Sequence, residues 1–176
     1  MPSKVKLLNH GLNETVRLTR LYRRQVAPKV KPVDTEGFIS VDIGVDLPLK
    51  GRLDVEEGDG IRDLKGASRS WPKGRAGKEI QPAIYTMLFL KKRGIHPTFI
   101  YDVLVALQDD EKHQVISDDV TRKKLKATLA VIYRVMRSIE SGVFNPCDPT
   151  SWVCSERFCG YYLTCPYVGN GHQAWI

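Results

Sequence analysis

The segment GRLDVEEGDGIRDLKG, residues 51–66, contains two short runs in which polar and apolar residues alternate. Gly-Asp-Gly, residues 58–60, separates the two runs, and this is a strong local signal for a tight β-hairpin. We therefore expect two antiparallel strands here, with the rest of the chain packed around them.

The register of this hairpin depends on which two residues form its loop, because partners across an antiparallel pair keep a constant sum of residue numbers. A loop of residues 58 and 59 puts Asp54 opposite Asp63, whereas a loop of residues 59 and 60 puts Asp54 opposite Lys65 and Glu56 opposite Asp63. In both cases the alternation of a strand places these four side chains on one face. The other face is expected to be core and to carry Leu53, Val55 and Leu64.

The acidic face of the hairpin is a candidate cation site. Two carboxylates about 5 Å apart repel by roughly 3 kcal/mol at an effective dielectric of 20, so a partly buried pair needs a partner. Mg²⁺ is a suitable one, because it takes one or two carboxylates together with phosphate oxygens. Lys65 would point at the same site and hold the attacking water or the phosphate charge. The alternative is a solvated hairpin with ordinary surface charges.

Composition limits the class of protein. The chain has 176 residues, enough for one domain with a core of its own. Its 27 Lys and Arg against 20 Asp and Glu give a net charge of +7, which favours a polyanionic partner. No apolar run is long enough to span a bilayer and no signal peptide is evident, so we expect a cytoplasmic protein that does not bind membranes.

Periodicity predicts the remaining elements. Helical spacing predicts helices at residues 8–26, 79–93 and 119–141. Strands are predicted beside the hairpin at residues 37–45, 47–56 and 97–107. Residues 67–78 are expected to form a loop and residues 109–113 an exposed turn. This order of elements predicts an α/β fold, a mixed sheet of about four strands flanked by helices.

Gln81 and Tyr85 lie four residues apart on the helix predicted after the loop. That spacing puts both polar tips on one side of the helix, from which they can reach the same site. A tyrosine half-buried at the edge of the core would give the same pattern.

The loop at residues 67–78 interleaves basic residues with an aromatic residue. Stacking on the aromatic ring and charge along the backbone are what a single-stranded nucleic acid requires. The candidate nucleic-acid-binding residues are Arg69, Trp71, Lys73, Arg75 and Lys78. A solvated loop is the alternative.

Four cysteines lie in the C-terminal tail with the spacing C-x6-C-x4-C-x5-C. They are Cys147, Cys154, Cys159 and Cys165. A cytoplasmic protein keeps its thiols reduced, so these cysteines are better read as metal ligands than as disulfides. Structural zinc sites usually show C-x2-C pairs, which are absent from this sequence, and the irregular spacing fits an iron–sulfur cluster better.

The order of these motifs resembles the PD-(D/E)xK nuclease superfamily. It is similar to the RecB-type exonuclease branch, which also holds iron–sulfur CRISPR adaptation nucleases and phage exonucleases. The resemblance extends from Glu36 to the C-terminus and rests on GRLD ending at Asp54, IRDLK ending at Lys65, the pair Gln81 and Tyr85, and the late cysteines. It implies a restriction-endonuclease-like fold and a metal-dependent DNA exonuclease that hydrolyses phosphodiester bonds at single-stranded ends.

The resemblance also implies roles for individual residues. The catalytic set would be Asp54, Asp63, Lys65, Gln81 and Tyr85. Mg²⁺ or Mn²⁺ would be bound by Asp54, Asp63 and the backbone carbonyl of Leu64, with His10 as a further ligand from the N-terminal helix. Lys65 would orient water, and the helix pair would steady the site.

The four cysteines would hold a structural cluster of the 4Fe–4S type, with zinc as the alternative. Relatives draw their first cluster cysteine from far upstream, but no cysteine precedes Cys147 here. Either Cys147 replaces that ligand or the chain has lost an N-terminal segment that carried it.

We expect one nuclease domain over residues 1–176, in three parts. Residues 1–35 form the N-terminal helix and lead-in, residues 36–142 the nuclease core and residues 143–176 the cysteine tail. Single-stranded DNA is the expected partner, together with recombination or CRISPR adaptation proteins in a bacterial, archaeal or phage-infected cell. The competing hypothesis is a catalytically inactive nucleic-acid-binding module stabilised by zinc or a cluster.

Overall fold

The computed structural model describes the backbone of residues 4–44, 47–108, 110–143, 146–148, 150–165 and 167. Side chains are described for these residues except 4–10 and 118. The chain divides into two compact units, residues 1–131 and 132–176, and the boundary falls inside the last long helix.

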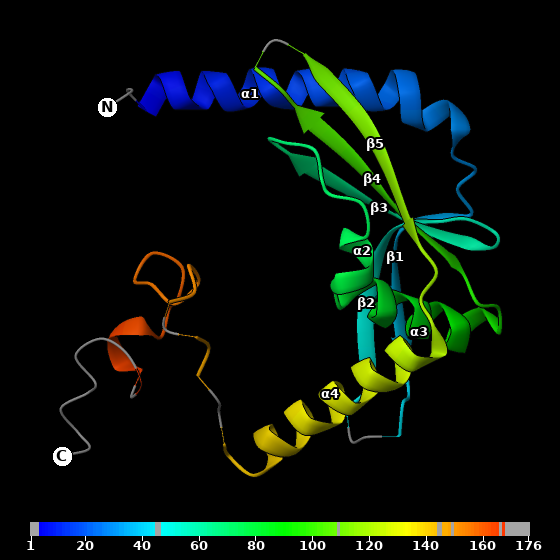
Figure 1. The fold of residues 1–176 in the computed structure, drawn as a ribbon, viewed down its shortest axis with the longest axis vertical. Coiled ribbons are helices and arrows are strands. Elements are labelled where there is room, and N and C mark those ends of the chain that lie inside the picture. Colours follow the sequence, from blue (N-terminus) through cyan, green and yellow to red (C-terminus); the bar gives the residue numbers. More distant parts are fainter. Residues whose placement is uncertain are drawn as a thin grey trace. The chain divides into compact units, whose positions relative to one another are not determined.

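The first unit contains a mixed five-stranded sheet in the order β1-β2-β3-β4-β5 (Figure 1). Its strands are β1 (Asp34–Val41), β2 (Leu49–Glu56), β3 (Gly60–Ala67), β4 (Thr98–Ala106) and β5 (Glu111–Asp118). Only β3 and β4 pair in parallel, and the other neighbours are antiparallel. The α/β fold with a mixed sheet is therefore confirmed.

The prediction of a turn at residues 109–113 is wrong for its second half. Glu111 begins β5, which pairs with β4 along its whole length. The early residues of β5 are polar, and a polar run at a sheet edge reads like a loop. An edge strand is held by backbone hydrogen bonds, so its side chains do not need to be apolar.

The helices are close to the predicted ranges. They are α1 (Lys4–Leu21), α2 (Arg75–Lys78), α3 (Gln81–Arg93) and α4 (Arg122–Glu140). A π-helical turn (Tyr22–Val26) and a 3-10 turn (Ala27–Lys29) extend α1. The short helix α2 lies inside the segment that was predicted to be a loop. None of the described helices combines the length and apolar character needed to cross a membrane.

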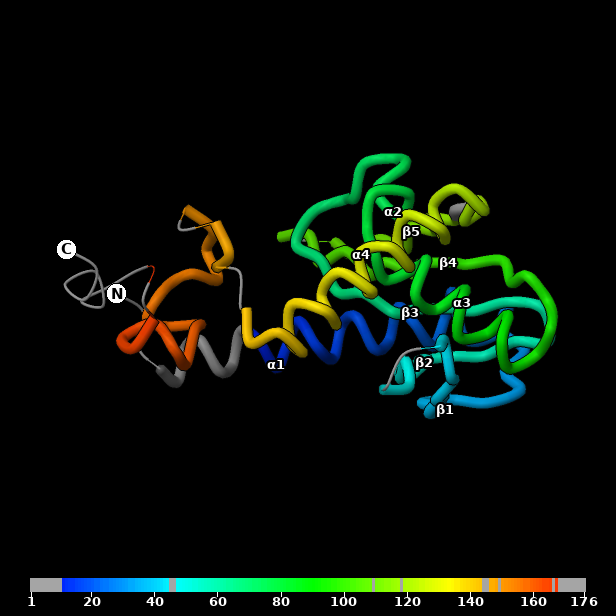
Figure 2. Tube along the Cα trace, turned by 90° about the horizontal axis from the view of Figure 1, so that it is seen from below, coloured from blue at the N-terminus to red at the C-terminus, as the bar shows by residue number. Residues whose placement is uncertain are grey.

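Two hydrophobic clusters lie on opposite faces of the sheet. The larger one packs α3 against the sheet, and α3 lies along β1 and β2 (Figure 2). Phe99, Tyr101 and Val103 of β4 belong to this cluster. Leu104, the next residue of β4, instead packs against Leu21 at the end of α1. Because side chains alternate along a strand, α1 and α3 cover different faces.

The position of α3 is set by its ends. Pro82 lies in the first turn, where its missing N–H costs nothing, and this places Gln81 at the start of the helix. Gly94 ends the helix with φ of 72°, and its N–H donates to the carbonyl of Leu90 at 2.8 Å. The end agrees with the sequence-based prediction, and the start lies two residues after the predicted one.

The register of the central hairpin is the first of the two alternatives. Val55 pairs with Arg62, and Glu56 with Ile61. The N–H of Glu57 donates to the carbonyl of Gly60 at 2.9 Å, which leaves residues 58 and 59 as the loop. This register places residue 54 opposite residue 63, but the paired ladder ends before reaching them.

The predicted division of the hairpin into a polar face and a core face is wrong. Leu53 is part of the α3-side core, and Glu56 bonds to basic residues of α3. These two residues of β2 are three apart, so both can face α3 only if alternation is interrupted between them. The interruption coincides with Asp54 and with its neighbour Glu36 on β1, which has φ of +54° and is skipped in the β1–β2 pairing.

The second unit contains the last part of α4 and the described residues of the cysteine tail. The tail is a succession of tight turns, with a short 3-10 helix at Tyr162–Thr164. Trp152 packs edge-on against Phe158 with ring centroids 5.0 Å apart.

Candidate active site

Asp63 is the centre of the candidate site. It lies in the middle of β3, on the face covered by α3, and is 1% exposed. Its Oδ1 accepts a hydrogen bond from Nε2 of Gln81 at 2.8 Å. Its Oδ2 lies 2.7 Å from Nζ of Lys65, yet this buried oxygen accepts no well-directed hydrogen bond from the described residues.

Burial raises the pKa of the Asp63 carboxyl above its ordinary value. The ammonium of Lys65 lowers that pKa, but the negative charges of Asp54 and Glu79 add to the effect of burial. Asp63 therefore carries its charge at a cost that its neighbours in the protein only partly offset.

Asp54 lies where β2 and β3 separate. Its Oδ2 accepts a hydrogen bond from the backbone N–H of Leu64 at 2.8 Å, so a side chain replaces the backbone partner that β2 would have supplied. Asp54 also lines a cavity of about 280 Å³ together with Tyr22 and Asp102, whereas Asp63 bonds to Gln81 of α3.

The two residues predicted on the helix, Gln81 and Tyr85, have different surroundings. Gln81 contacts Asp63 directly, as predicted for a site residue. Tyr85 lies partly buried at the margin of the core, where its ring packs near Phe99 with centroids 6.3 Å apart and beside Gly51. Its position agrees with the alternative of a tyrosine at the core edge.

Tyr101 and Glu79, which were not predicted as site residues, also belong to the site. The hydroxyl of Tyr101 lies 3.0 Å from Oε2 of Glu79 and 3.4 Å from Oε1 of Gln81. Hydrogen bonds from Arg75 and Tyr101 hold the pKa of Glu79 below its ordinary value although burial opposes them. From the sequence, Tyr101 could be predicted only as a buried strand residue. Its position beside Asp63 depends on the β3–β4 pairing, which the sequence does not show.

The predicted nucleic-acid loop borders a cavity of about 520 Å³, lined by residues 66–72 and 75. The side chain of Gln114 on β5 fixes this loop by bonding to both the N–H and the carbonyl of Trp71, at 2.9 and 2.7 Å. The Arg75 guanidinium lies 3.7 Å from the centre of the Trp71 ring. Trp71 is thus held in place, with one partner for its ring already present.

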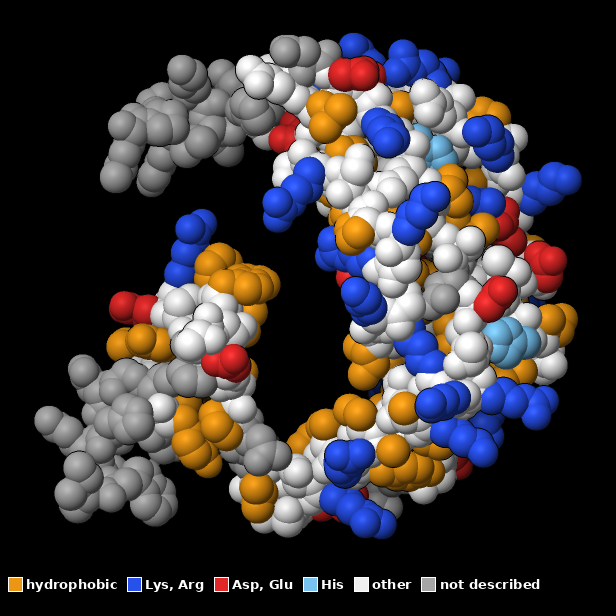
Figure 3. Space-filling view, in the orientation of Figure 1, with side chains coloured by type: hydrophobic (Ala, Val, Ile, Leu, Met, Phe, Trp, Pro, Cys, Tyr) orange, Lys and Arg blue, Asp and Glu red, His pale blue; other side chains and the backbone are white. Residues whose placement is uncertain are grey.

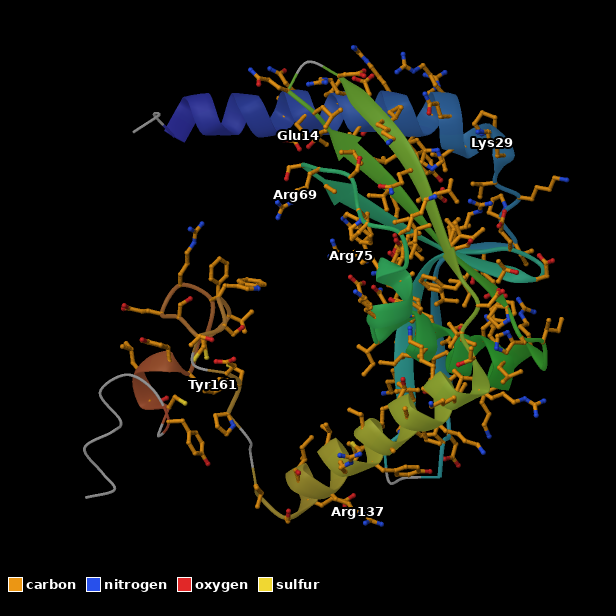
Figure 4. All side chains as sticks on the ribbon, viewed as in Figure 1. Glu14, Lys29, Arg69, Arg75, Arg137 and Tyr161 are labelled. Carbon is orange, nitrogen blue, oxygen red and sulfur yellow. The ribbon has the colours of Figure 1, made fainter. Side chains whose placement is uncertain are left out.

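Two basic side chains, Arg69 and Arg75, line this cavity, and the same loop carries further ones. Arg69, Lys73 and Lys78 are exposed. Arg69 and Arg75 lie on the same side of the sheet (Figure 4). The space-filling view shows Lys and Arg side chains over this loop (Figure 3). The loop therefore offers a polyanion both charge and a fixed backbone.

The remaining predicted ligands are His10 and the four cysteines of the tail. The side chain of His10 is outside the described residues. In the tail, the thiol of Cys154 interacts with those of the other three cysteines. Its pKa is raised by burial, by a hydrogen bond with Cys147 and by the nearby Cys165 and Cys159. Within the described part of the chain, no three His, Cys, Asp or Glu side chains already form a metal-binding group.

Comparison with known proteins supports the fold. No protein-family model matches the sequence, and no curated protein matches it significantly. Among solved structures, the chain is similar to a protein named "Putative exonuclease" from Eubacterium rectale, with a TM-score of 0.59 and 18% identity over 80% of this chain. The match spans 57% of the length of that protein.

A second solved structure, named SSO0001, matches with a TM-score of 0.49 and 17% identity, over 89% of this chain and 69% of the other. At 18% identity, the likeness to the Eubacterium rectale protein shows the fold alone. The architecture is an α/β mixed sheet flanked by helices, consistent with a restriction-endonuclease-like fold.

Proposed function

We propose that this protein is a metal-dependent DNA nuclease, an exonuclease that hydrolyses phosphodiester bonds at single-stranded ends. The observation that carries the proposal is the buried carboxylate of Asp63, with Lys65 2.7 Å away and Gln81 2.8 Å away. The likeness in fold to a protein named as an exonuclease supports the same class of reaction.

The residues present fit a divalent cation. Oδ2 of Asp63 is a buried oxygen without a well-directed donor among the described residues, and the charge of Asp54 adds to burial in raising its pKa. Hard cations such as Mg²⁺ and Mn²⁺ prefer oxygen ligands of this kind. Asp54, Asp63 and the backbone carbonyl of Leu64 would hold the ion, and His10 remains a predicted further ligand.

The chain's own groups have separable tasks. When bound, the cation supplies a Lewis acid that makes water more acidic and neutralises charge on the scissile phosphate. The Lys65 side chain is 31% exposed, so its ammonium can donate to a water or a phosphate oxygen at the edge of the site. Gln81 holds one oxygen of Asp63 and so fixes the direction of the carboxylate.

The proposal is tested by incubating end-labelled single-stranded DNA with Mn²⁺ and the purified protein. We expect progressive degradation from an end, and Asp63→Ala should lower kcat/KM by more than about a thousandfold, or about 4 kcal/mol. Asp59→Ala is the matched control, because it removes an exposed carboxylate from the tip of the same hairpin. Equal activity of the two variants would refute the proposal.

A second candidate function is a nucleic-acid-binding module without catalysis. It is favoured by the fixed basic loop, which does not depend on the carboxylates for its structure. If the wild-type protein and Asp63→Ala are equally inert but bind single-stranded DNA with a strong salt dependence, this function replaces the nuclease.

We also propose that the four tail cysteines bind a structural iron–sulfur cluster of the 4Fe–4S type. The hydrogen bond between the Cys154 and Cys147 thiols and the influence of Cys159 and Cys165 on Cys154 support a shared ligand. Protein purified without oxygen should be brown and lose its colour in Cys154→Ser. A colourless protein with one equivalent of zinc would replace the cluster by a zinc site.

A further inference from the structure

The hydroxyl of Tyr101 is a buried donor that faces two acceptors. The residue is 0% exposed, and its oxygen lies 3.0 Å from Oε2 of Glu79 and 3.4 Å from Oε1 of Gln81. Burial and the neighbouring Glu79 raise its pKa, so the phenol stays protonated. A phenol carries one proton, and the two acceptors therefore compete for it.

The amide of Gln81 can take two orientations, and only one of them suits Asp63. An ionised carboxylate accepts hydrogen bonds and cannot donate, so the NH₂ group must face it. This is the orientation observed, with Nε2 2.8 Å from Oδ1 of Asp63. The amide oxygen then points toward the Tyr101 hydroxyl. The carboxylate thus selects this orientation, and the Tyr101 hydroxyl can hold the amide in it by bonding to the amide oxygen.

We infer that Tyr101 is a positioning residue for the candidate site: its hydroxyl holds the Gln81 amide in the orientation that donates to Asp63, in competition with Glu79. Its effect on catalysis rests on the proposed nuclease function. The hydrogen-bond arrangement is a property of the protein itself and can be measured without any substrate.

The surroundings of Tyr101 keep this arrangement rigid. Arg75 bonds to the other oxygen of Glu79 at 2.8 Å and lies over the Trp71 ring, whose centroid is 5.3 Å from that of Tyr101. These four side chains form a closed set between the basic loop and the site. Tyr101 is the member that also reaches Gln81, so it joins the loop to the Asp63 carboxylate.

The kinetic test is a double-mutant cycle with Tyr101→Phe and Gln81→Ala in the Mn²⁺-dependent nuclease assay. Tyr101→Phe keeps the buried ring and should lower kcat by about tenfold with little change in KM. In the Gln81→Ala protein, it should cause no further loss. Tyr161→Phe, which removes a hydroxyl from a residue that is 78% exposed, should leave kcat unchanged. Equal losses in both backgrounds, or no loss in either, would overturn the inference.

Proton exchange of the Gln81 side-chain amide, followed by ¹⁵N NMR, tests the same arrangement without activity. In the wild-type protein the amide bonds to Asp63 and Tyr101, so its protons should exchange slowly with solvent. Tyr101→Phe should speed this exchange about tenfold, because the loosened amide opens more often, and Tyr161→Phe should not change it. Unchanged exchange in Tyr101→Phe overturns the positioning role even if DNA is cleaved. Faster exchange in a protein that cleaves no DNA would leave the inference standing and refute only the nuclease function.

Discussion

Replacing Asp63 by Asn should make the metal-free protein more stable. The carboxylate is 1% exposed, and burial raises its pKa although the Lys65 ammonium lies 2.7 Å from Oδ2. A buried charge that its partner only partly offsets costs on the order of 1 kcal/mol. The new NH₂ group would meet the Lys65 ammonium, but that side chain is 31% exposed and can turn toward solvent. We therefore expect a net gain of about 1 kcal/mol, or roughly 2–4 °C in Tm.

The direction of the pKa shift explains why Asp63→Asn should raise the stability of the protein. Burial raises the pKa of Asp63 above its ordinary 3.8, so the folded protein binds this proton more tightly than the unfolded chain. The tighter binding of this proton stabilises the folded protein. This stabilisation is complete below pH 3.8 and is lost as the pH rises through the folded-state pKa. At neutral pH the charged carboxylate is thus a penalty, which Asn removes.

Mn²⁺ should reverse the order of stability. An ion that binds only the folded protein stabilises it by about 2.7 kcal/mol at a concentration a hundred times its Kd. The wild-type protein should gain this amount and Asp63→Asn should not, because the variant lacks the carboxylate. Thermal unfolding followed by circular dichroism, in EDTA and in Mn²⁺, measures both effects. Asp59→Asn at the hairpin tip should respond as the wild type does.

Two results would refute this reasoning. If Asp63→Asn is less stable than the wild type in EDTA, the carboxylate is satisfied in the folded protein and carries no burial penalty. If Mn²⁺ stabilises both proteins equally, the ion binds elsewhere and the proposed metal site is wrong.

Three further predictions concern other side chains. Lys65 lowers the pKa of Asp63, so Lys65→Met should move the acid limb of the pH profile of kcat/KM to higher pH. An unmoved limb would show that Asp63 does not control the acid limb. Burial opposes ionisation of Glu56, but two basic residues of α3 hold its pKa below 4.5, and Glu56→Gln should cost about 1–3 kcal/mol in urea unfolding. The Glu56 contribution is present above pH 4.5 and should be lost as the pH falls through the lowered pKa, so a constant difference between the two proteins would contradict it. Gln114→Leu frees the backbone of Trp71 and should weaken single-stranded DNA binding by about tenfold while keeping its salt dependence, as measured by fluorescence anisotropy.

The local features of the fold could be predicted because they depend on neighbouring residues. The two-residue loop of the hairpin and the end of α3 at Gly94 both follow from residue types within a few positions. Strand alternation, which also depends on neighbouring residues, predicted that Asp63 and Lys65 lie on the same face of β3. Helical spacing predicted that Gln81 can reach the site. The structure brings these three side chains together.

Other features depend on contacts between distant segments. Strand alternation fails between Leu53 and Glu56, where the β1–β2 pairing omits Asp54 and its neighbour Glu36, whose φ is +54°. Strand β5 has a polar start and exists through its backbone pairing with β4.

The sequence by itself determined the first four strands, the three long helices, and the carboxylate, lysine and glutamine of the candidate site, since turn residues, caps and periodicity act over a few positions. Only the tertiary structure decided that Tyr101 and Glu79 complete this site and that Asp54 bonds to the backbone of Leu64. The physical reason is that these contacts depend on how strands pair across the sheet, and a strand's own sequence does not fix the register of its neighbour.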